Sequence, residues 1–251
     1  PFSLINALSD RKLRNYWASS GATSLLPKFV ENMEMKMEYF DHCFIEGDTL
    51  ETSDVVNGGA ELFLYQSGYL TIKGYDDGVY ILGFPNFEVR KALYRVVVPA
   101  LTMKSNSEVV SAQSFLRKMM QDGNTAEAKK ALKALIADVP YSNKKMASMD
   151  MEERYRLIMS TIFRALGFRV EVERMLATGR IDMIVEVPSI IYVLELKLSN
   201  NGGISAAESQ IKDKSYTEPF KADKRKVITL AVELDETGKG LIDWKEVDEG
   251  V

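Results

Sequence analysis

The chain has 251 residues, of which 46% are hydrophobic and 27% charged, and its net charge at pH 7 is −4. This length and balance predict a soluble globular protein with one large domain or two ordinary ones. The longest apolar runs are strand-sized and soon interrupted by charge, which excludes a transmembrane span. The negative charge excludes a global basic surface for nucleic acid but leaves a local patch open. The candidates for that patch, for which a solvated loop is the commoner explanation, are Lys221, Lys224, Arg225 and Lys226.

Histidine and cysteine are too scarce for several kinds of active site. The chain has one histidine, His42, beside its one cysteine, Cys43. This pair cannot close a zinc site, so a structural role is favoured. A single cysteine also excludes an internal disulfide and predicts a reducing compartment, the cytoplasm. The start at Pro1, without a signal sequence, predicts a fragment of a longer chain. Any active site must therefore use carboxylates, lysine and a bound metal.

The first half of the chain combines helical patterns with one β-hairpin. β-Branched and aromatic residues on both sides of Asp76-Asp77-Gly78 predict the hairpin between residues 68 and 86. A helix is expected from Glu88 to Val97, and helices flanking one hairpin indicate a winged-helix-like module. A polar connection at 102–106 precedes two more expected helices. They span 107–120 and 125–137, are separated by Asp122-Gly123-Asn124, and are expected to bridge the two halves.

The second half is expected to form a mixed sheet between helices. Asp150 can cap a helix that runs to Leu166, and Gly167 can end it. The expected strands span 168–174, 181–187 and 190–198, with Pro188-Ser189 turning the last two into a hairpin. A helix at 204–216 and a strand at 227–233 complete the order α, β, β, β, α, β.

Three charged residues stand out in this predicted sheet. Strand alternation places Glu195 and Lys197 on one face, and the hairpin brings Asp182 of the partner strand near Glu195. Burying such groups is unfavourable unless they are paired or coordinate something. A divalent cation relieves the repulsion between two carboxylates, and oxygen ligands suit Mg²⁺ or Mn²⁺. The backbone carbonyl of Leu196 is a further expected ligand, and Lys197 could orient a metal-activated water or stabilise charge on a phosphate.

The alternative is a surface strand in which Glu195 and Lys197 form an ordinary ion pair and Asp182 lies in a turn. Glu-Leu-Lys alone is a weak signal. The hairpin spacing and the preceding Gly179-Arg180-Ile181 make the combination more specific, and the cost of burying three charges favours the functional interpretation.

These residues carry a resemblance to a known family. Gly179-Arg180-Ile181-Asp182 and Tyr192-Val193-Leu194-Glu195-Leu196-Lys197 resemble the PD-(D/E)xK nuclease superfamily. Residues 150–244 resemble its domain fused C-terminally to AAA-ATPase-like proteins of gut bacteria. The further matching residues are Glu152, Tyr155, Glu173, Gln210-Ile211, Tyr216 and Ile242-Asp243-Trp244. Pro1-Phe2-Ser3-Leu4, Tyr16-Trp17 and residues 65–72 resemble the segment after the ATPase core, but no Gly-x-x-x-x-Gly-Lys-Ser/Thr loop occurs in the chain.

The resemblance implies an α/β (α+β) fold class, with a restriction-endonuclease-like mixed sheet flanked by helices and preceded by a mostly helical, winged-helix-like domain. The implied division is 1–101 for the winged-helix-like segment of an AAA-ATPase-like region, 102–145 for a helical connection and 146–251 for the nuclease-like domain. One departure is Ile181, which replaces the proline that often precedes the first aspartate.

The resemblance also implies roles for individual residues. Asp182 and Glu195 would be metal ligands, Lys197 the catalytic lysine, Glu152 a carboxylate near the metal and Gln210 a polar residue facing the site. Glu152 is equally explained by the helix dipole, with Glu153 able to take either role, and Gln210 by ordinary exposure on a helix. Glu173 and Arg180 could contact substrate, although an ordinary salt bridge is favoured.

The main hypothesis is a Mg²⁺-dependent nuclease that hydrolyses nucleic-acid phosphodiesters, with DNA favoured over RNA. The alternative is a catalytically silent module that binds nucleic acid or protein, which the negative charge supports slightly. A third hypothesis is a domain regulated by an upstream ATPase region. No membrane partner is expected, and no motif reports the oligomeric state.

Overall fold

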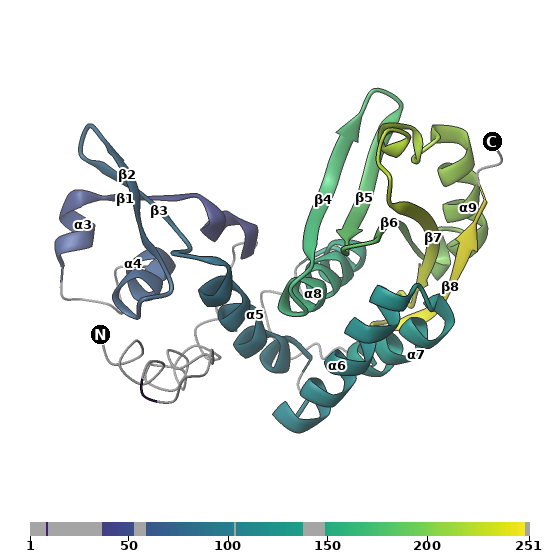
Figure 1. Cartoon of the computed structure of the whole chain (residues 1–251), viewed down its shortest axis with the longest axis horizontal. Coiled ribbons are helices and arrows are strands. Elements are labelled where there is room, and N and C mark those ends of the chain that lie inside the picture. The colour runs from purple at the N-terminus through teal and green to yellow at the C-terminus, as the bar shows by residue number, and fades with distance from the viewer. Residues whose placement is uncertain (1–8, 10–36, 53–58, 103, 138–148, 249–251) are drawn as a thin grey trace. The chain divides into compact units, whose positions relative to one another are not determined.

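The computed structural model describes residue 9 and residues 37–52, 59–102, 104–137 and 149–248 of the chain (Figure 1). The chain divides into two compact units, Pro1–Val97 and Val98–Val251, and each is described by itself. The segments Pro1-Phe2-Ser3-Leu4 and Tyr16-Trp17, which resemble the region after an ATPase core, lie outside the described residues.

The first unit contains a three-stranded antiparallel sheet in the order β1-β3-β2. The predicted hairpin is confirmed, because β2 and β3 pair around Asp77 and Gly78, which both have positive φ angles. Strand β1 was not predicted, and it buries Cys43. In chain order, the described elements are a 3-10 helix at Met37–Asp41, β1 at Cys43–Glu46, α3 at Gly47–Glu51, α4 at Gly59–Gln66, β2 at Thr71–Asp76, β3 at Val79–Gly83 and α5 at Phe87–Thr102.

Helix α5 runs across the division between the units and continues through Pro99, beyond its expected end at Val97. The winged-helix-like assignment of the first unit stays a prediction.

The second unit begins with two helices at nearly the expected positions. Helix α6 spans Asn106–Asp122 and starts with a capping box, in which Ser105 and Glu108 satisfy each other's backbone N–H groups. Gly123 ends α6 in a left-handed conformation, and Asn124 then caps α7, which spans Thr125–Ile136. Both helices pack on the sheet of this unit: the Tyr192 hydroxyl donates to the Met120 carbonyl, and the Trp244 indole donates to the Thr125 carbonyl. The boundaries predicted at residues 101 and 145 stay predictions.

A five-stranded mixed sheet forms the core of the second unit, in the order β4-β5-β6-β7-β8. Only β6 and β7 are parallel, while the other neighbouring strands are antiparallel. The expected order of elements is confirmed, but the edge strand β8 was not predicted. Together with α6 and α7, the elements of the second unit are α8 at Met151–Ala165, β4 at Arg169–Leu176, β5 at Gly179–Glu186, β6 at Ile190–Leu198, α9 at Gly203–Lys214, β7 at Lys226–Leu234 and β8 at Leu241–Val247, with 3-10 turns at Ser199–Asn201 and Glu218–Phe220.

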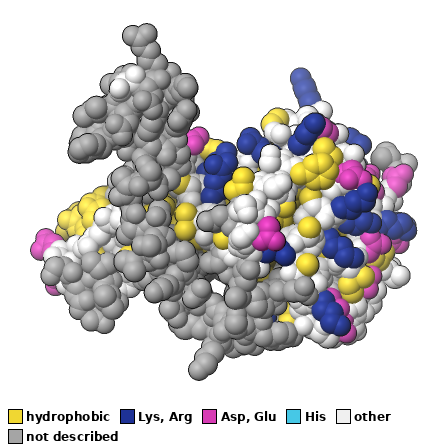
Figure 2. Space-filling view, turned by 90° about the horizontal axis from the view of Figure 1, so that it is seen from below, with side chains coloured by type: hydrophobic (Ala, Val, Ile, Leu, Met, Phe, Trp, Pro, Cys, Tyr) yellow, Lys and Arg dark blue, Asp and Glu magenta, His cyan; other side chains and the backbone are white. Residues whose placement is uncertain are grey.

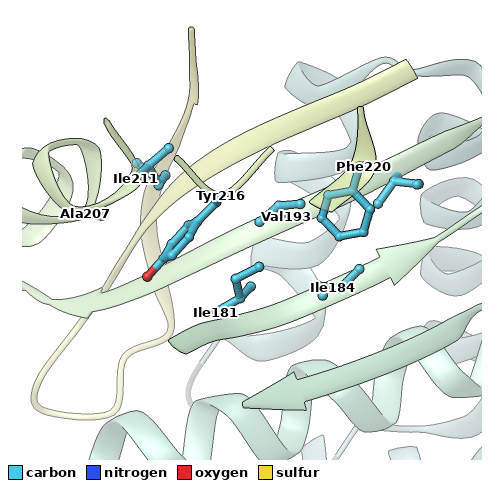
Figure 3. Close-up of a cluster of buried hydrophobic side chains, with 9 residues drawn as sticks. Ile181, Ile184, Val193, Ala207, Ile211, Tyr216 and Phe220 are labelled. Atoms are coloured by element: carbon cyan, nitrogen blue, oxygen red, sulfur yellow. The ribbon is translucent and has the colours of Figure 1, made fainter. Parts of the chain in front are cut away.

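Both faces of the central strand β6 are buried, which explains its nearly continuous apolar sequence. On one face, Ile191 and Val193 pack against Ala207 and Ile211 of α9 (Figure 3). On the other, Tyr192 reaches the end of α6. Helix α8 packs along β4, β5 and β6. A charged side chain on β6 is therefore held inside the protein.

Among the described residues, no helix has the length and apolar character needed to cross a membrane.

Candidate active site

The site begins where β5 and β6 stop pairing. Their ladder runs from Glu186 opposite Ile191 to Met183 opposite Leu194, and Asp182 is the next residue of β5. Its Oδ2 atom accepts a hydrogen bond of 2.9 Å from the backbone N–H of Leu196, which takes the place of a ladder bond. The Asp182 side chain is therefore fixed beside the end of β6, with only 3% of the residue exposed.

Glu195 is completely buried on the face of β6 that α9 covers. Its Oε1 atom lies 2.7 Å from the Lys197 ammonium, and its Oε2 atom lies 3.0 Å from the Tyr216 hydroxyl. Burial and the negative charge of Asp182 raise the pKa of Glu195 to about 7, although Lys197 and Tyr216 act in the opposite direction. This carboxyl group is therefore poised to exchange a proton near neutral pH.

The Lys197 ammonium lies between two oxygens of its own strand. It donates to Glu195 Oε1 and, over 3.3 Å, to the backbone carbonyl of Leu196. Burial lowers the pKa of Lys197, but the bond to Glu195 and the charges of Glu195, Asp182 and Glu152 outweigh this effect and raise it. Lys197 is thus a fixed cation in the site and not a neutral base.

Helix α8 brings Glu152 close to Asp182. The Arg156 guanidinium lies between them, because its Nη2 atom is 3.1 Å from Glu152 Oε1 and 3.7 Å from Asp182 Oδ1. Burial and the charge of Asp182 raise the pKa of Glu152. Arg156 therefore holds two acidic groups that would otherwise repel each other.

Glu173 of β4 joins this cluster from an unusual backbone conformation. Its φ angle is 54°, in the left-handed region that costs a non-glycine residue about 1 kcal/mol or more. Its Oε1 atom accepts from Arg156 Nη1 at 3.1 Å and from Arg180 Nη1 at 2.9 Å. One carboxylate oxygen thus connects the buried arginine with the half-exposed one.

Gln210 reaches the site through Tyr216. The Gln210 amide donates to the Tyr216 hydroxyl over 2.9 Å, and that hydroxyl contacts both Glu195 and the backbone carbonyl of Arg180, the latter at 2.7 Å. Tyr216 also packs by its ring against the apolar cluster below α9 (Figure 3). The end of α9 is therefore linked to both strands that carry the charged residues.

The available donors suit a hard divalent cation, with one qualification. Asp182 and Glu195 supply carboxylate oxygens, and Leu196 supplies a carbonyl oxygen. In the part of the chain that the structure describes, no three or more His, Cys, Asp or Glu side chains are arranged to hold a metal ion. Glu152 is engaged with Arg156, and Lys197 contacts Glu195 and Leu196. A metal ion held by all the predicted ligands would have to displace the Arg156 guanidinium and the Lys197 ammonium.

The structure brings Asp182, Glu195, Lys197, Glu152 and Gln210 to one region, at one end of β5 and β6. Sequence reasoning missed Arg156 and gave Tyr216 no role. A signal for Arg156 was present, because it follows Glu152 by one helical turn on α8.

The basic run near residue 225 forms no continuous basic surface. Arg225 is paired with Asp223 and Glu186, and Lys221 with Glu218. On the face shown in Figure 2, Lys and Arg side chains likewise alternate with acidic and apolar groups. Any contact with a polyanion must therefore depend on a few local cations.

Comparison with known proteins identifies this region of the chain. Residues 150–244 match the PD-(D/E)XK nuclease superfamily, and this part of the chain is a domain of that superfamily. The mixed five-stranded sheet flanked by helices is consistent with a restriction-endonuclease-like fold.

A curated relative extends the similarity over both units. It is described as "Uncharacterized protein in vnfD 5'region" of Azotobacter chroococcum mcd 1. The alignment covers 96% of this chain, and the two sequences are 25% identical within it. The chain spans about half of this relative, 48% of its length. No solved structure matches the chain significantly.

Proposed function

We propose that the domain at 150–244 is a Mg²⁺- or Mn²⁺-dependent nuclease that hydrolyses phosphodiester bonds of nucleic acid, with DNA as the favoured substrate. The observation that supports it most is the juxtaposition of two buried carboxylates, Asp182 and Glu195, with a charged lysine, Lys197, within a PD-(D/E)XK domain. Burying these charges is costly unless they are paired or coordinate a ligand.

In this proposal each group has a distinct task. A bound divalent cation supplies a water of lowered pKa and polarises the phosphate. Asp182, Glu195, the Leu196 carbonyl and Glu152 would hold this cation. Lys197 is charged, so it stabilises negative charge on the phosphoryl oxygens and orients the attacking water. Gln210 and Tyr216 position Glu195.

A second candidate is a catalytically silent module that binds nucleic acid or protein. It is favoured by the two cations, Lys197 and Arg156, that already neutralise the acidic groups without a metal. The net charge of −4 supports it as well. In this case the charged cluster would serve only to stabilise the sheet.

Cleavage of plasmid DNA and of a labelled RNA by the purified chain, with Mg²⁺ or with EDTA, tests the first candidate. Metal-dependent cleavage is expected, and Glu195→Ala and Lys197→Ala are expected to abolish it. Glu171→Gln is the control, because Glu171 lies on β4 and pairs only with Arg174 among the described residues. Unchanged cleavage by the two alanine variants would show that the site is assigned wrongly.

Calorimetric titration with Mg²⁺ or Mn²⁺ separates the two candidates. Binding by wild type that Asp182→Ala removes supports the nuclease. No binding to wild type, or equal binding to both proteins, supports the silent module.

The fusion of this domain to an AAA-ATPase-like region, and control of cleavage by that region, are also part of the proposal. They rest on the resemblance of both halves to such proteins. Comparison of DNA cleavage by a longer natural protein with and without ATP would test them.

A further inference from the structure

The end of the β4–β5 hairpin separates from the rest of the sheet. Strands β4 and β5 stay paired as far as Leu176 opposite Gly179, whereas the pairing of β5 with β6 stops at Met183. Within the described sheet, residues 174–181 therefore form a two-stranded ribbon. In Figure 1 the turn of this hairpin extends away from α8. Asp182 lies where the ribbon begins.

The two faces of this ribbon differ in what covers them. On the α9 face, the Arg174 guanidinium lies 5.5 Å from the centre of the Phe220 ring. The other face carries Met175 and Arg180, which are directly opposite each other in the strand register and therefore project side by side. Helix α8 reaches this face at Glu173, which Arg156 contacts, and it leaves Met175 open to solvent.

Exposure increases along this open face from the carboxylates towards the turn. The exposed fraction of the side chain is 4% for Asp182, 28% for Glu173 and 46% for Arg180, and Met175 is 75% exposed as a residue. Among the large hydrophobic residues that the structure describes, Met175 is the most exposed. Arg180 connects the two ends, because its Nη2 atom lies 4.0 Å from Asp182 Oδ1. The open face thus leads from solvent to the buried carboxylates.

The pair of Met175 and Arg180 suits contact with a strand of nucleic acid. A nucleotide presents an apolar sugar and base beside an anionic phosphate, and the open face presents an apolar side chain beside a guanidinium. Arginine forms strong charge-assisted hydrogen bonds with phosphate, and methionine is flexible enough to pack against surfaces of different shape. A phosphate contact carries no sequence information, so this surface suits binding that does not depend on sequence.

Arg180 is already held in position for such a contact. Its carbonyl accepts the Tyr216 hydroxyl, and its Nη1 atom donates to Glu173 Oε1. A guanidinium has five N–H donors, so the bond to Glu173 leaves others for an incoming anion. Arg180 can therefore bind a phosphate while Glu173 keeps the side chain in place.

We propose that the open face formed by Met175 and Arg180 binds the nucleic-acid strand that enters the site. Arg180 binds a phosphate, and Met175 packs against the adjoining sugar and base. This inference rests on the proposed function, and it names the surface that guides the substrate to Asp182 and Glu195.

A fluorescent reporter on the open face tests the proposal directly. The only cysteine of the sequence, Cys43, is completely buried, so a cysteine introduced at the surface can be labelled selectively. Met175→Cys would carry a dye that is sensitive to its surroundings. It would be titrated with a short DNA duplex, its single strand and the matching RNA duplex. The titrations would be made in EDTA, and repeated with Mg²⁺ in a Lys197→Ala background, which is expected not to cleave.

The emission of this reporter is expected to change when nucleic acid binds. The matched control is Ile242→Cys with the same dye, because Ile242 is an exposed hydrophobic residue of β8, at the opposite edge of the same sheet. Its emission is expected to stay unchanged.

Affinities at several salt concentrations separate the two contacts, with fluorescence anisotropy of labelled DNA as the measurement. Arg180→Gln is expected to weaken binding about 3- to 10-fold and to reduce the salt slope by about one, because a phosphate contact is lost. Met175→Ala is expected to weaken binding about 2- to 5-fold with an unchanged salt slope, because the lost contact is apolar. Arg169→Gln, at the other end of the same hairpin, and Ile242→Ala are expected to bind as wild type does.

Each outcome supports or overturns the binding surface separately from the nuclease. A silent reporter at position 175 while DNA binds, or wild-type affinity of Arg180→Gln and Met175→Ala, overturns the surface even if the chain cleaves DNA. No binding of any probe in either condition also overturns it. A reporter that responds to protein concentration and not to nucleic acid assigns the face to a second copy of the chain. The expected responses without metal-dependent cleavage by wild type support the surface and overturn the nuclease.

Discussion

The Lys197 ammonium lies 2.7 Å from Glu195 Oε1 and 3.3 Å from the Leu196 carbonyl, so it contacts two of the oxygens expected to bind a metal. A metal cation bound to these two oxygens would lie close to the Lys197 ammonium, and the two positive charges would repel each other. The lysine therefore has two opposing effects in the proposed enzyme: it disfavours metal binding and favours the charged state that follows attack on the phosphate.

Replacement of Lys197 by methionine should separate these effects. Lys197→Met is expected to bind Mg²⁺ about tenfold more tightly at pH 8, a difference of ~1.4 kcal/mol, because the competing charge is gone. It should nevertheless lose cleavage. Calorimetry and a plasmid assay measure the two properties, with Lys245→Met on β8 as the control. Weaker metal binding by Lys197→Met would refute the competition.

Metal binding should also release a proton near neutral pH. The pKa of Glu195 is raised to about 7, so a large fraction of this carboxyl is protonated at pH 6, whereas a metal ligand must be ionised. The affinity for Mg²⁺ is therefore expected to rise with pH through this region and level off above about 8. Calorimetry in two buffers of different ionisation enthalpy counts the protons released. Glu195→Gln should show no such release, and an unchanged count in this variant would contradict the assignment.

The same carboxyl predicts how the stability of the metal-free protein depends on pH. Since the pKa of Glu195 is raised from 4.5 to about 7, the folded chain binds more protons than the unfolded chain between these values. The contribution of this group to the free energy of unfolding should then fall as pH rises through this window, and stay constant above it. The loss is on the order of a few kcal/mol.

Urea denaturation at pH 5 and pH 8 in EDTA checks this prediction. Glu195→Gln preserves the shape of the side chain but cannot ionise, so its stability should decline less between the two pH values than that of wild type. An equal decline in both proteins would mean that another group causes the pH dependence.

Local sequence signals were sufficient to predict most helices and strands of the second unit. Capping residues and glycines set both ends of α6 and α8 and the start of α7, and alternation on β6 correctly placed Glu195 on the face of Val193. Strand β8 was missed because its polar positions lie at an edge of the sheet, where one side is exposed and the apolar pattern is weak.

The electrostatic partners in the site were harder to predict, because they depend on packing. The approach of Asp182 to the Leu196 N–H follows from the end of a strand ladder, which the sequence does not mark. Arg156 likewise contacts Glu173 of β4 only because α8 packs on the sheet. Helical spacing can suggest its pairing with Glu152, but not its contact with two further carboxylates.

Two buried tyrosines on opposite faces of the sheet allow a controlled test of the site. The Tyr216 hydroxyl contacts Glu195, Arg180 and Gln210, whereas the Tyr192 hydroxyl donates to Met120 of α6. Loss of either hydroxyl should destabilise the fold by about 1–2 kcal/mol. Only Tyr216→Phe should also weaken Mg²⁺ binding and slow cleavage, because only Tyr216 positions a proposed metal ligand. Equal effects of Tyr216→Phe and Tyr192→Phe on cleavage would reduce Tyr216 to a packing role.

The packing of α6 and α7 predicts which fragment of the chain can fold. The Tyr192 hydroxyl donates to Met120, the Trp244 indole donates to Thr125, and Lys129 pairs with Asp243 of β8. A fragment that starts at residue 146 loses all three contacts and exposes apolar surface of β6 and β8. We expect a fragment of residues 98–251 to unfold cooperatively, and one of residues 146–251 to be less stable by several kcal/mol or unfolded, as measured by circular dichroism during heating. Equal stability of the two fragments would show that the helices are only a connection, as the predicted boundary at residue 145 implies.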